Sequence, residues 1–66
     1  MDMIRVNSSA LIAVGYRSET GQMRIQFQQG RSYDFVGVPL HIYDGLMRAT
    51  SKGAYYNDHI RDRYQA

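Results

Sequence analysis

An α+β fold is predicted by three features of this 66-residue sequence. Two stretches in the first half alternate apolar and polar residues with the period of two that is typical of half-buried strands. A third stretch carries two aromatic residues and ends at a glycine, and beyond the single proline the apolar spacing changes to three and four, which is typical of helices. We therefore expect a three-stranded antiparallel β-meander followed by two C-terminal α-helices packed on one sheet face.

The first two predicted strands flank a turn-forming segment, Ser18-Glu19-Thr20-Gly21. The inward residues are the alternating apolar ones. The register that this turn favours pairs them as follows: Tyr16 with Met23, Val14 with Ile25, and Ile12 with Phe27. Every inward residue then meets an inward partner across the two strands.

The third predicted strand runs from Arg31 to Val36 and directs Tyr33 to the core face. A two-residue reversal at Gln29-Gly30 would place Phe27 opposite the outward-facing Ser32. We therefore expect a bulge or a three-residue loop, because either one shifts the register and brings Phe27 opposite Tyr33.

The N-terminal residues 1–8 show a pattern that is compatible with two structures. They are either a frayed tail or a short edge strand through Ile4 and Val6. No repeat, low-complexity tract or linker interrupts the sequence, so residues 1–66 are expected to form a single domain.

Two helices are predicted after the sheet, the first beginning at Pro39, whose φ suits the first helical turn. Gly45 lies inside this helix and costs about 1 kcal/mol relative to Ala, which indicates close packing against a neighbouring backbone. Ser51 is the expected N-cap of the second helix. The apolar stripes of the two helices are Ile42, Tyr43, Leu46 and Ala49 in the first, and Tyr56, Ile60 and Tyr64 in the second.

Composition restricts the function classes. The chain has no cysteine, which excludes disulfides and thiolate metal sites. No stretch approaches the roughly 20 apolar residues of a membrane span, and the N-terminus lacks the apolar core of a signal peptide, so a cytoplasmic protein is expected. Eight basic side chains against six acidic ones give a net charge of +2, and seven of the eight are arginine. The net charge alone identifies no polyanionic partner, but guanidinium groups suit phosphate contacts and stacking on bases.

A series of Gly, Pro, Ser and aromatic positions extends through most of the chain: Ser9, Val14, Gly15, Tyr16, Gly30, Tyr33, Phe35, Gly37, Val38, Pro39, Tyr43, Ala49, Ser51, Gly53, Tyr55, Tyr56, Asn57, Ile60 and Tyr64. This series resembles the KTSC domain, a short family found at the C-terminus of some lysyl-tRNA synthetases and as free-standing bacterial and phage proteins. The family has no established activity, and its synthetase context implies RNA binding. Where the family has Tyr-x-Tyr, this sequence has Tyr33-Asp34-Phe35 and so lacks the second phenolic hydroxyl.

No catalytic residue, metal site or cofactor is expected, and the protein is predicted not to be an enzyme. His41 and Asp44 are one turn apart on the first predicted helix, but no nucleophile motif accompanies them, so we interpret them as a solvent-facing pair. His41 and His59 lack the further ligands that a metal site needs.

One aromatic side chain of the second helix is predicted to be exposed. Tyr55 and Tyr56 cannot both face the core, because neighbouring residues on a helix differ by about 100°. With Tyr56 in the apolar stripe, Tyr55 should be accessible near His59. The candidate residues for binding nucleic acid or another partner are Lys52, Tyr55, Arg61 and Arg63.

The sequence therefore predicts a noncatalytic binding module with RNA as the first partner class. The alternative is a module for protein–protein interaction or self-association, without a nucleic-acid role. A homodimer is also expected, through the first strand or the Ile4–Val6 segment, because a small core and an unpaired strand edge favour pairing with a second copy. The competing possibility is that the N-terminal segment covers the strand edge of its own chain and leaves a monomer.

Overall fold

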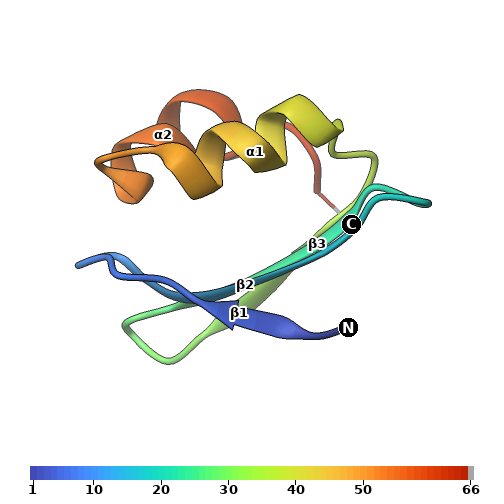
Figure 1. Cartoon of the computed structure of the whole chain (residues 1–66). Coiled ribbons are helices and arrows are strands. Elements are labelled where there is room, and N and C mark those ends of the chain that lie inside the picture. Colours follow the sequence, from blue (N-terminus) through green and yellow to red (C-terminus); the bar gives the residue numbers. More distant parts are fainter. Residues whose placement is uncertain (66) are drawn as a thin grey trace.

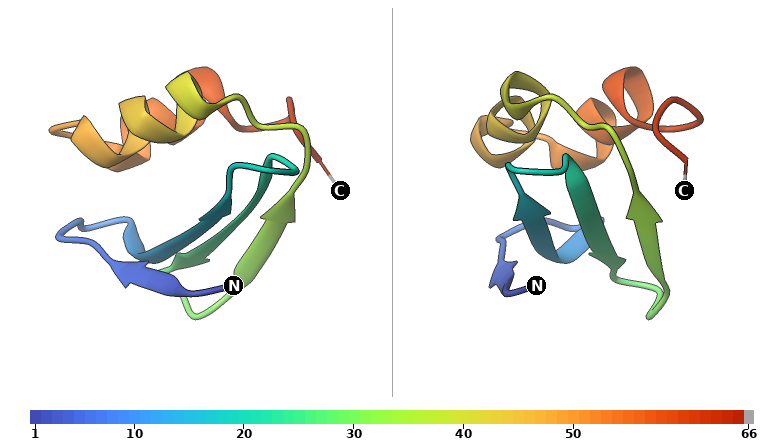
Figure 2. Two further views of the ribbon diagram at one scale, coloured as in Figure 1. Left: turned by 45° about the vertical axis from the view of Figure 1, so that its right-hand side comes forward. Right: turned by 90° about the vertical axis from the view of Figure 1, so that its right-hand side faces the viewer.

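The computed structural model describes residues 1–65 and consists of an antiparallel sheet with two helices over one of its faces (Figure 1). The elements in chain order are β1 (Met3–Arg5), β2 (Leu11–Arg17), β3 (Gln22–Phe27), β4 (Ser32–Phe35), α1 (Leu40–Arg48) and α2 (Lys52–His59). The predicted α+β class and the placement of both helices on one face are confirmed (Figure 2). The sheet has four strands in the order β1-β2-β3-β4, not three, because the N-terminal segment pairs with β2 as a short edge strand.

The register between β2 and β3 departs from the prediction at one end. Two predicted pairs are confirmed: Tyr16 with Met23, and Val14 with Ile25. The predicted pairing of Ile12 with Phe27 is wrong, because the register shifts between Leu11 and Ala13 and brings Leu11 opposite Phe27. The extra residue lets Leu11, rather than Ile12, enter the core, where it is fully buried.

A three-residue loop joins β3 to β4, as predicted. The Phe27 amide donates to the Arg31 carbonyl at 2.8 Å, and Gly30 adopts a positive φ of 99° within the loop. Tyr33 lies opposite Ile25, so its predicted place directly opposite Phe27 is wrong. The two rings are diagonal neighbours on one face and still meet edge to face, with centroids 5.6 Å apart.

Both helices begin within one residue of the predicted position, but Ala49, Ile60 and Tyr64 of the predicted stripes lie beyond the helix ends at Arg48 and His59. Pro39 is the N-cap of α1, so the helix itself starts one residue later than expected, at Leu40. Ser51 is the N-cap of α2, and its Oγ accepts a hydrogen bond from the Ala54 amide at 3.3 Å. This bond satisfies one of the amide groups that a helix N-terminus leaves without a partner.

The hydrophobic core lies between the sheet and the helices. It combines residues of the inner sheet face with residues from the helical half of the chain: Leu11, Val14, Met23, Ile25, Phe35, Val38, Leu46 and Ile60. Phe27 is half-buried and packs against this cluster. On the opposite sheet face Gly15 is also buried, because the side chains of Met1 and Met3 cover it. They lie so close that a Cβ at position 15 would be 2.7 Å from Met3 Sδ and 2.9 Å from Met1 Sδ.

The two edges of the sheet differ. At the β4 edge the C-terminal segment returns to the sheet, where the Val36 amide donates to the Tyr64 carbonyl at 2.8 Å and Phe35 forms an antiparallel bridge with Gln65. At the other edge, no strand within residues 1–65 pairs with the outer side of β1. Figure 2 shows the N-terminal strand and the C-terminal segment at opposite sides of the sheet.

Candidate functional site

Lys52, predicted as a binding residue, joins the two helices. It is the first residue of α2 and is half-buried. Its Nζ donates to the Met47 carbonyl at 3.1 Å and to the Ala49 carbonyl at 3.0 Å, at the end of α1. Lys and Arg side chains stabilise helix C-termini in this way. The ammonium group therefore has a structural role in the fold described here.

Tyr55 does not have the exposure that the sequence predicts. It is half-buried, since it lies over Gly45 of α1, which has no side chain to exclude it. The expected neighbour of Gly45 was a backbone, and the structure shows a tyrosine ring in its place. The predicted proximity of Tyr55 to His59 is present, with ring centroids 4.3 Å apart.

Arg61 and Arg63 are both exposed in the turn that follows α2. Within residues 1–65, the polar contacts of the Arg61 side chain are long: 3.5 Å from its Nη1 to Asn57 Oδ1 and 3.9 Å from its Nε to Asp62 Oδ2. The structure thus separates the predicted residues, with Lys52 and Tyr55 between the helices and both arginines beyond the helix end.

Arg61 and three aromatic residues line one hollow at the border of β4 and α2. We call the hollow lined by Phe27, Tyr33, Tyr56 and Arg61 the Tyr33 groove. It measures about 360 Å³, and an adjoining hollow of about 340 Å³ shares Tyr33, Tyr56 and Arg61. The tyrosine that gives the groove its name is 41% exposed. The Tyr33 groove therefore combines a flat apolar surface with the exposed guanidinium group of Arg61.

The aromatic residues of the Tyr33 groove support one another. Phe27 meets Tyr33 edge to face and meets Tyr56 in the same way at 5.0 Å, while Tyr56 also contacts Phe35 at 6.0 Å. Burial raises the pKa of Tyr56 above its ordinary value, so this phenol stays neutral at physiological pH. The floor of the groove is therefore aromatic and uncharged, with Tyr33 as its accessible wall.

The sequence prediction did not select Tyr33 as a binding residue, because period-two alternation assigns it to the core face. That face is correct, but β4 is the last strand of the sheet and Tyr33 lies at its border. The available signal was the position of the third predicted strand at an edge of the meander, where inward side chains have core neighbours on one side only.

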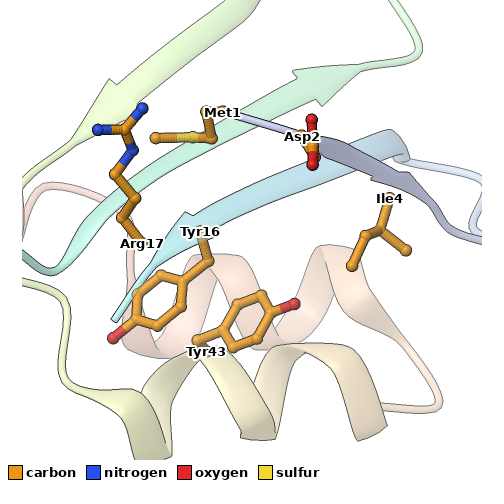
Figure 3. A pocket seen from close by; sticks show the side chains of 6 residues that line it. All are labelled: Met1, Asp2, Ile4, Tyr16, Arg17 and Tyr43. Atoms are coloured by element: carbon orange, nitrogen blue, oxygen red, sulfur yellow. The ribbon is translucent and has the colours of Figure 1, made fainter. Parts of the chain in front are cut away.

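A second groove lies at the opposite edge of the sheet, between β1 and α1 (Figure 3). It measures about 420 Å³, and we call it the Tyr43 groove; its lining residues are Met1, Asp2, Ile4, Tyr16, Arg17 and Tyr43. The rings of Tyr16 and Tyr43 stack at 4.3 Å with an interplanar angle of 7°. The Tyr16 hydroxyl donates to the Val38 carbonyl at 2.7 Å, and burial, followed by the nearby Asp44 carboxylate, raises its pKa.

His41 and Asp44 are both exposed, as expected of a solvent-facing pair. Within residues 1–65, no three side chains of the His, Asp and Glu type gather closely enough to hold a metal ion. Neither of the helices described has the length and apolar character required to span a bilayer.

Comparison with known proteins identifies the family. The profile of the KTSC domain matches residues 7–64. The chain is 33% identical over 61 residues to a protein of Tsukamurella paurometabola, covering 92% of this chain and 91% of that one. The crystal structure of a KTSC domain protein from Yersinia pestis superposes with a TM-score of 0.88 and 31% identity, covering 96% of this chain and 89% of the other.

Longer relatives contain the same region as a small part. A lysine–tRNA ligase of Nostoc punctiforme is 25% identical over 63 residues, which is 96% of this chain but 11% of the ligase. The matching part of such ligases is their C-terminal region. An uncharacterized protein of Stutzerimonas stutzeri matches over 90% of its length at 27% identity. With the profile covering nearly the whole sequence and the structural match extending over the same fold, this chain belongs to the KTSC domain family.

Proposed function

We propose that this KTSC domain is a noncatalytic module that binds single-stranded nucleic acid, with RNA as the preferred class, in the Tyr33 groove. The observation that carries the proposal is that an exposed tyrosine and an exposed arginine line one hollow whose floor is formed by the side chains of Phe27 and Tyr56. Tyr33 and Arg61 line the same hollow, and Tyr56 lies behind them. Stacking of a base on an aromatic side chain contributes about 1–3 kcal/mol and tolerates any base sequence.

The charges around the groove suit a phosphate backbone. Within residues 1–65, the Arg61 guanidinium pairs with a carboxylate at 3.9 Å, from its Nε to Asp62 Oδ2, and it is exposed, so it is able to bind phosphate or stack on a base. Two further arginines are exposed: Arg31, two residues before Tyr33, and Arg63, two residues after Arg61. Two acidic residues, Asp34 and Asp62, line the adjoining hollow. The charge of Asp34 is compensated by Arg24 at 2.6 Å, and Asp62 lies 3.9 Å from Arg61.

The shape of the site favours single strands. A tyrosine at a sheet border is able to stack only on a base that is not already stacked within a duplex. The relationship to lysine–tRNA ligases, which act on tRNA by their name, supports RNA over DNA. The proposed site differs from the one predicted from the sequence. Tyr33 takes the stacking role expected of Tyr55, and exposed arginines take the phosphate-binding role expected of Lys52.

Fluorescence anisotropy with labelled single-stranded RNA of about ten nucleotides tests this function. Affinity should fall steeply with added salt, because bound phosphates release counterions. Tyr33→Ala should weaken binding roughly tenfold, while Val36→Ala, at an exposed apolar residue of the same sheet border, should change it less than twofold. Arg61→Gln should weaken binding and flatten the salt dependence, and Arg17→Gln serves as the charge-matched control.

Two results would remove the proposal. One is the absence of RNA and DNA binding at low salt. The other is binding that Tyr33→Ala and Val36→Ala affect equally, because the Tyr33 groove would then have no part in it.

A further inference from the structure

The outer edge of β1 presents hydrogen-bonding groups in a regular arrangement. β1 pairs with β2 through Ile4 opposite Val14, and the Val6 amide donates to the Ile12 carbonyl at 2.9 Å two residues further along. Hydrogen-bonded and non-hydrogen-bonded pairs alternate in an antiparallel ladder. Ile4 therefore bonds toward β2, and the N–H and C=O groups of the residues on either side of it point away from the sheet.

The fold protects its two edges differently. The C-terminal segment closes the β4 edge through the Tyr64 carbonyl and the Gln65 bridge. On the β1 side, the strand Met3–Arg5 contains no proline, and its protection against pairing is limited to its short length and the charge of Arg5. Among residues 1–65 the outer side of β1 has no partner strand, so a strand from another chain can add there.

We infer that β1 is a dimer interface, in which it pairs antiparallel with β1 of a second copy around a twofold axis at Ile4. The outward groups of Met3 and Arg5 lie symmetrically about Ile4, so Met3 pairs with Arg5 of the partner subunit and Arg5 with Met3 of the partner subunit. These two pairs make four backbone hydrogen bonds. Ile4 faces Ile4 of the partner subunit at the non-hydrogen-bonded position between them, where Cα atoms approach to about 4.5 Å.

The side chains at the axis are apolar and lack cover in one copy. Ile4 is 52% exposed on the helix-covered face and borders the Tyr43 groove (Figure 3). Antiparallel pairing keeps equivalent faces of both sheets on the same side, so the two α1 helices flank the axis. A second copy thus covers Ile4 and narrows the Tyr43 groove of each subunit.

The size of the contact predicts a weak dimer. Stable interfaces bury about 1,200–2,000 Å² in total, and a contact between two three-residue strands is small by that standard. The symmetry of the outward groups favours a second copy over an unrelated peptide, because the same three residues satisfy both sides of the contact.

The charge of the interface separates this proposal from nucleic-acid binding. Arg5 lies diagonally across the axis from Arg5 of the partner subunit, on the order of 8 Å away. Salt screens the repulsion between these like charges, so the dimer should strengthen as salt is added. Nucleic-acid binding in the Tyr33 groove should weaken under the same conditions.

Single-cysteine variants test the register, since the chain has no cysteine of its own. Ile4→Cys should form a disulfide-linked dimer under mild oxidation, because paired Cα atoms about 4.5 Å apart are within disulfide range. Arg5→Cys should cross-link at least tenfold more slowly, because its equivalent is beyond about 7 Å. Val36→Cys, an exposed apolar site at the opposite edge, gives the rate of random collision.

Sedimentation equilibrium of the full chain over a wide concentration range provides the second measurement. The dimer fraction of the unmodified chain should rise with concentration and with salt, Ile4→Glu should remove it, and Val36→Glu should leave it unchanged. A constant monomer mass, or cross-linking of Ile4→Cys no faster than that of Val36→Cys, would overturn the proposal. Circular dichroism is the control for folding: the spectrum of Ile4→Glu should match that of the unmodified chain, so that a loss of dimer is distinguished from a loss of fold.

Discussion

Tyr55 of α2 lies against the backbone of Gly45 in α1, so closely that a Cβ at position 45 would stand 2.6 Å from its Cζ atom. His59 contacts the Tyr55 ring at a centroid distance of 4.3 Å. This contact explains why a glycine lies inside a helix, where it is otherwise unfavourable. It also explains why a tyrosine that helical geometry directs away from the core is half-buried.

Gly45→Ala should destabilise the protein, although alanine in a helix normally adds about 1 kcal/mol of stability relative to glycine. The new methyl group overlaps Tyr55, and displacing that ring should cost about 1–3 kcal/mol, as is typical of overpacking. Urea unfolding followed by circular dichroism measures the difference. In a Tyr55→Ala background the same substitution should stabilise, because only helix propensity remains. A destabilisation that persists in that background would contradict the proposed cause.

Leu46→Ala and Leu40→Ala form a matched pair within α1. Leu46 is fully buried and Leu40 is 54% exposed. Leu46→Ala should lower the free energy of unfolding by about 2–5 kcal/mol, a large part of the stability of so small a domain. Leu40→Ala should change it by less than about 0.5 kcal/mol. Equal effects in thermal or urea unfolding would mean that α1 packs on the sheet through another face.

Lys52→Met should lower stability without altering RNA affinity. The substitution removes the two hydrogen bonds to the carbonyls of Met47 and Ala49, and bonds of this kind contribute about 1 kcal/mol. Arg48→Met, at an exposed arginine of the same helix junction, is the control for loss of a positive charge. A drop in RNA affinity specific to Lys52→Met would instead place that ammonium group in contact with phosphate.

Asp34 should titrate below the ordinary aspartate pKa of about 3.9, because the hydrogen bond from Arg24 lowers the pKa of its carboxyl group. A folded-state pKa below the unfolded one contributes stability that is present above the unfolded value and is lost as pH falls through the folded value. The pair is exposed, so this contribution is small. Carbon-detected NMR titration should show the low midpoint, Arg24→Gln should return it toward the ordinary value, and Arg17→Gln should leave it unchanged.

The sequence by itself determined the parts of this protein that depend on neighbouring residues. Alternation identified β2 and β3, the aromatic residues before Gly37 identified β4, and the turn residues before Met23 and at Gly30 defined where the chain reverses. Pro39 and Ser51 marked the beginnings of the helices because their effects on the backbone are local. The series of Gly, Pro and aromatic positions was sufficient to identify the family.

Only the tertiary structure decided which side chains are accessible. Tyr55 is covered by α1 because residue 45 is a glycine, and Tyr33 is accessible because β4 is the outermost strand in the sheet. The same holds for β1, whose three residues become a strand only through their hydrogen bonds to β2. Exposure and edge pairing arise from contacts between residues far apart in the chain. Local patterns therefore left the N-terminal segment as either a tail or an edge strand, and they assigned the accessible aromatic position to Tyr55 rather than Tyr33.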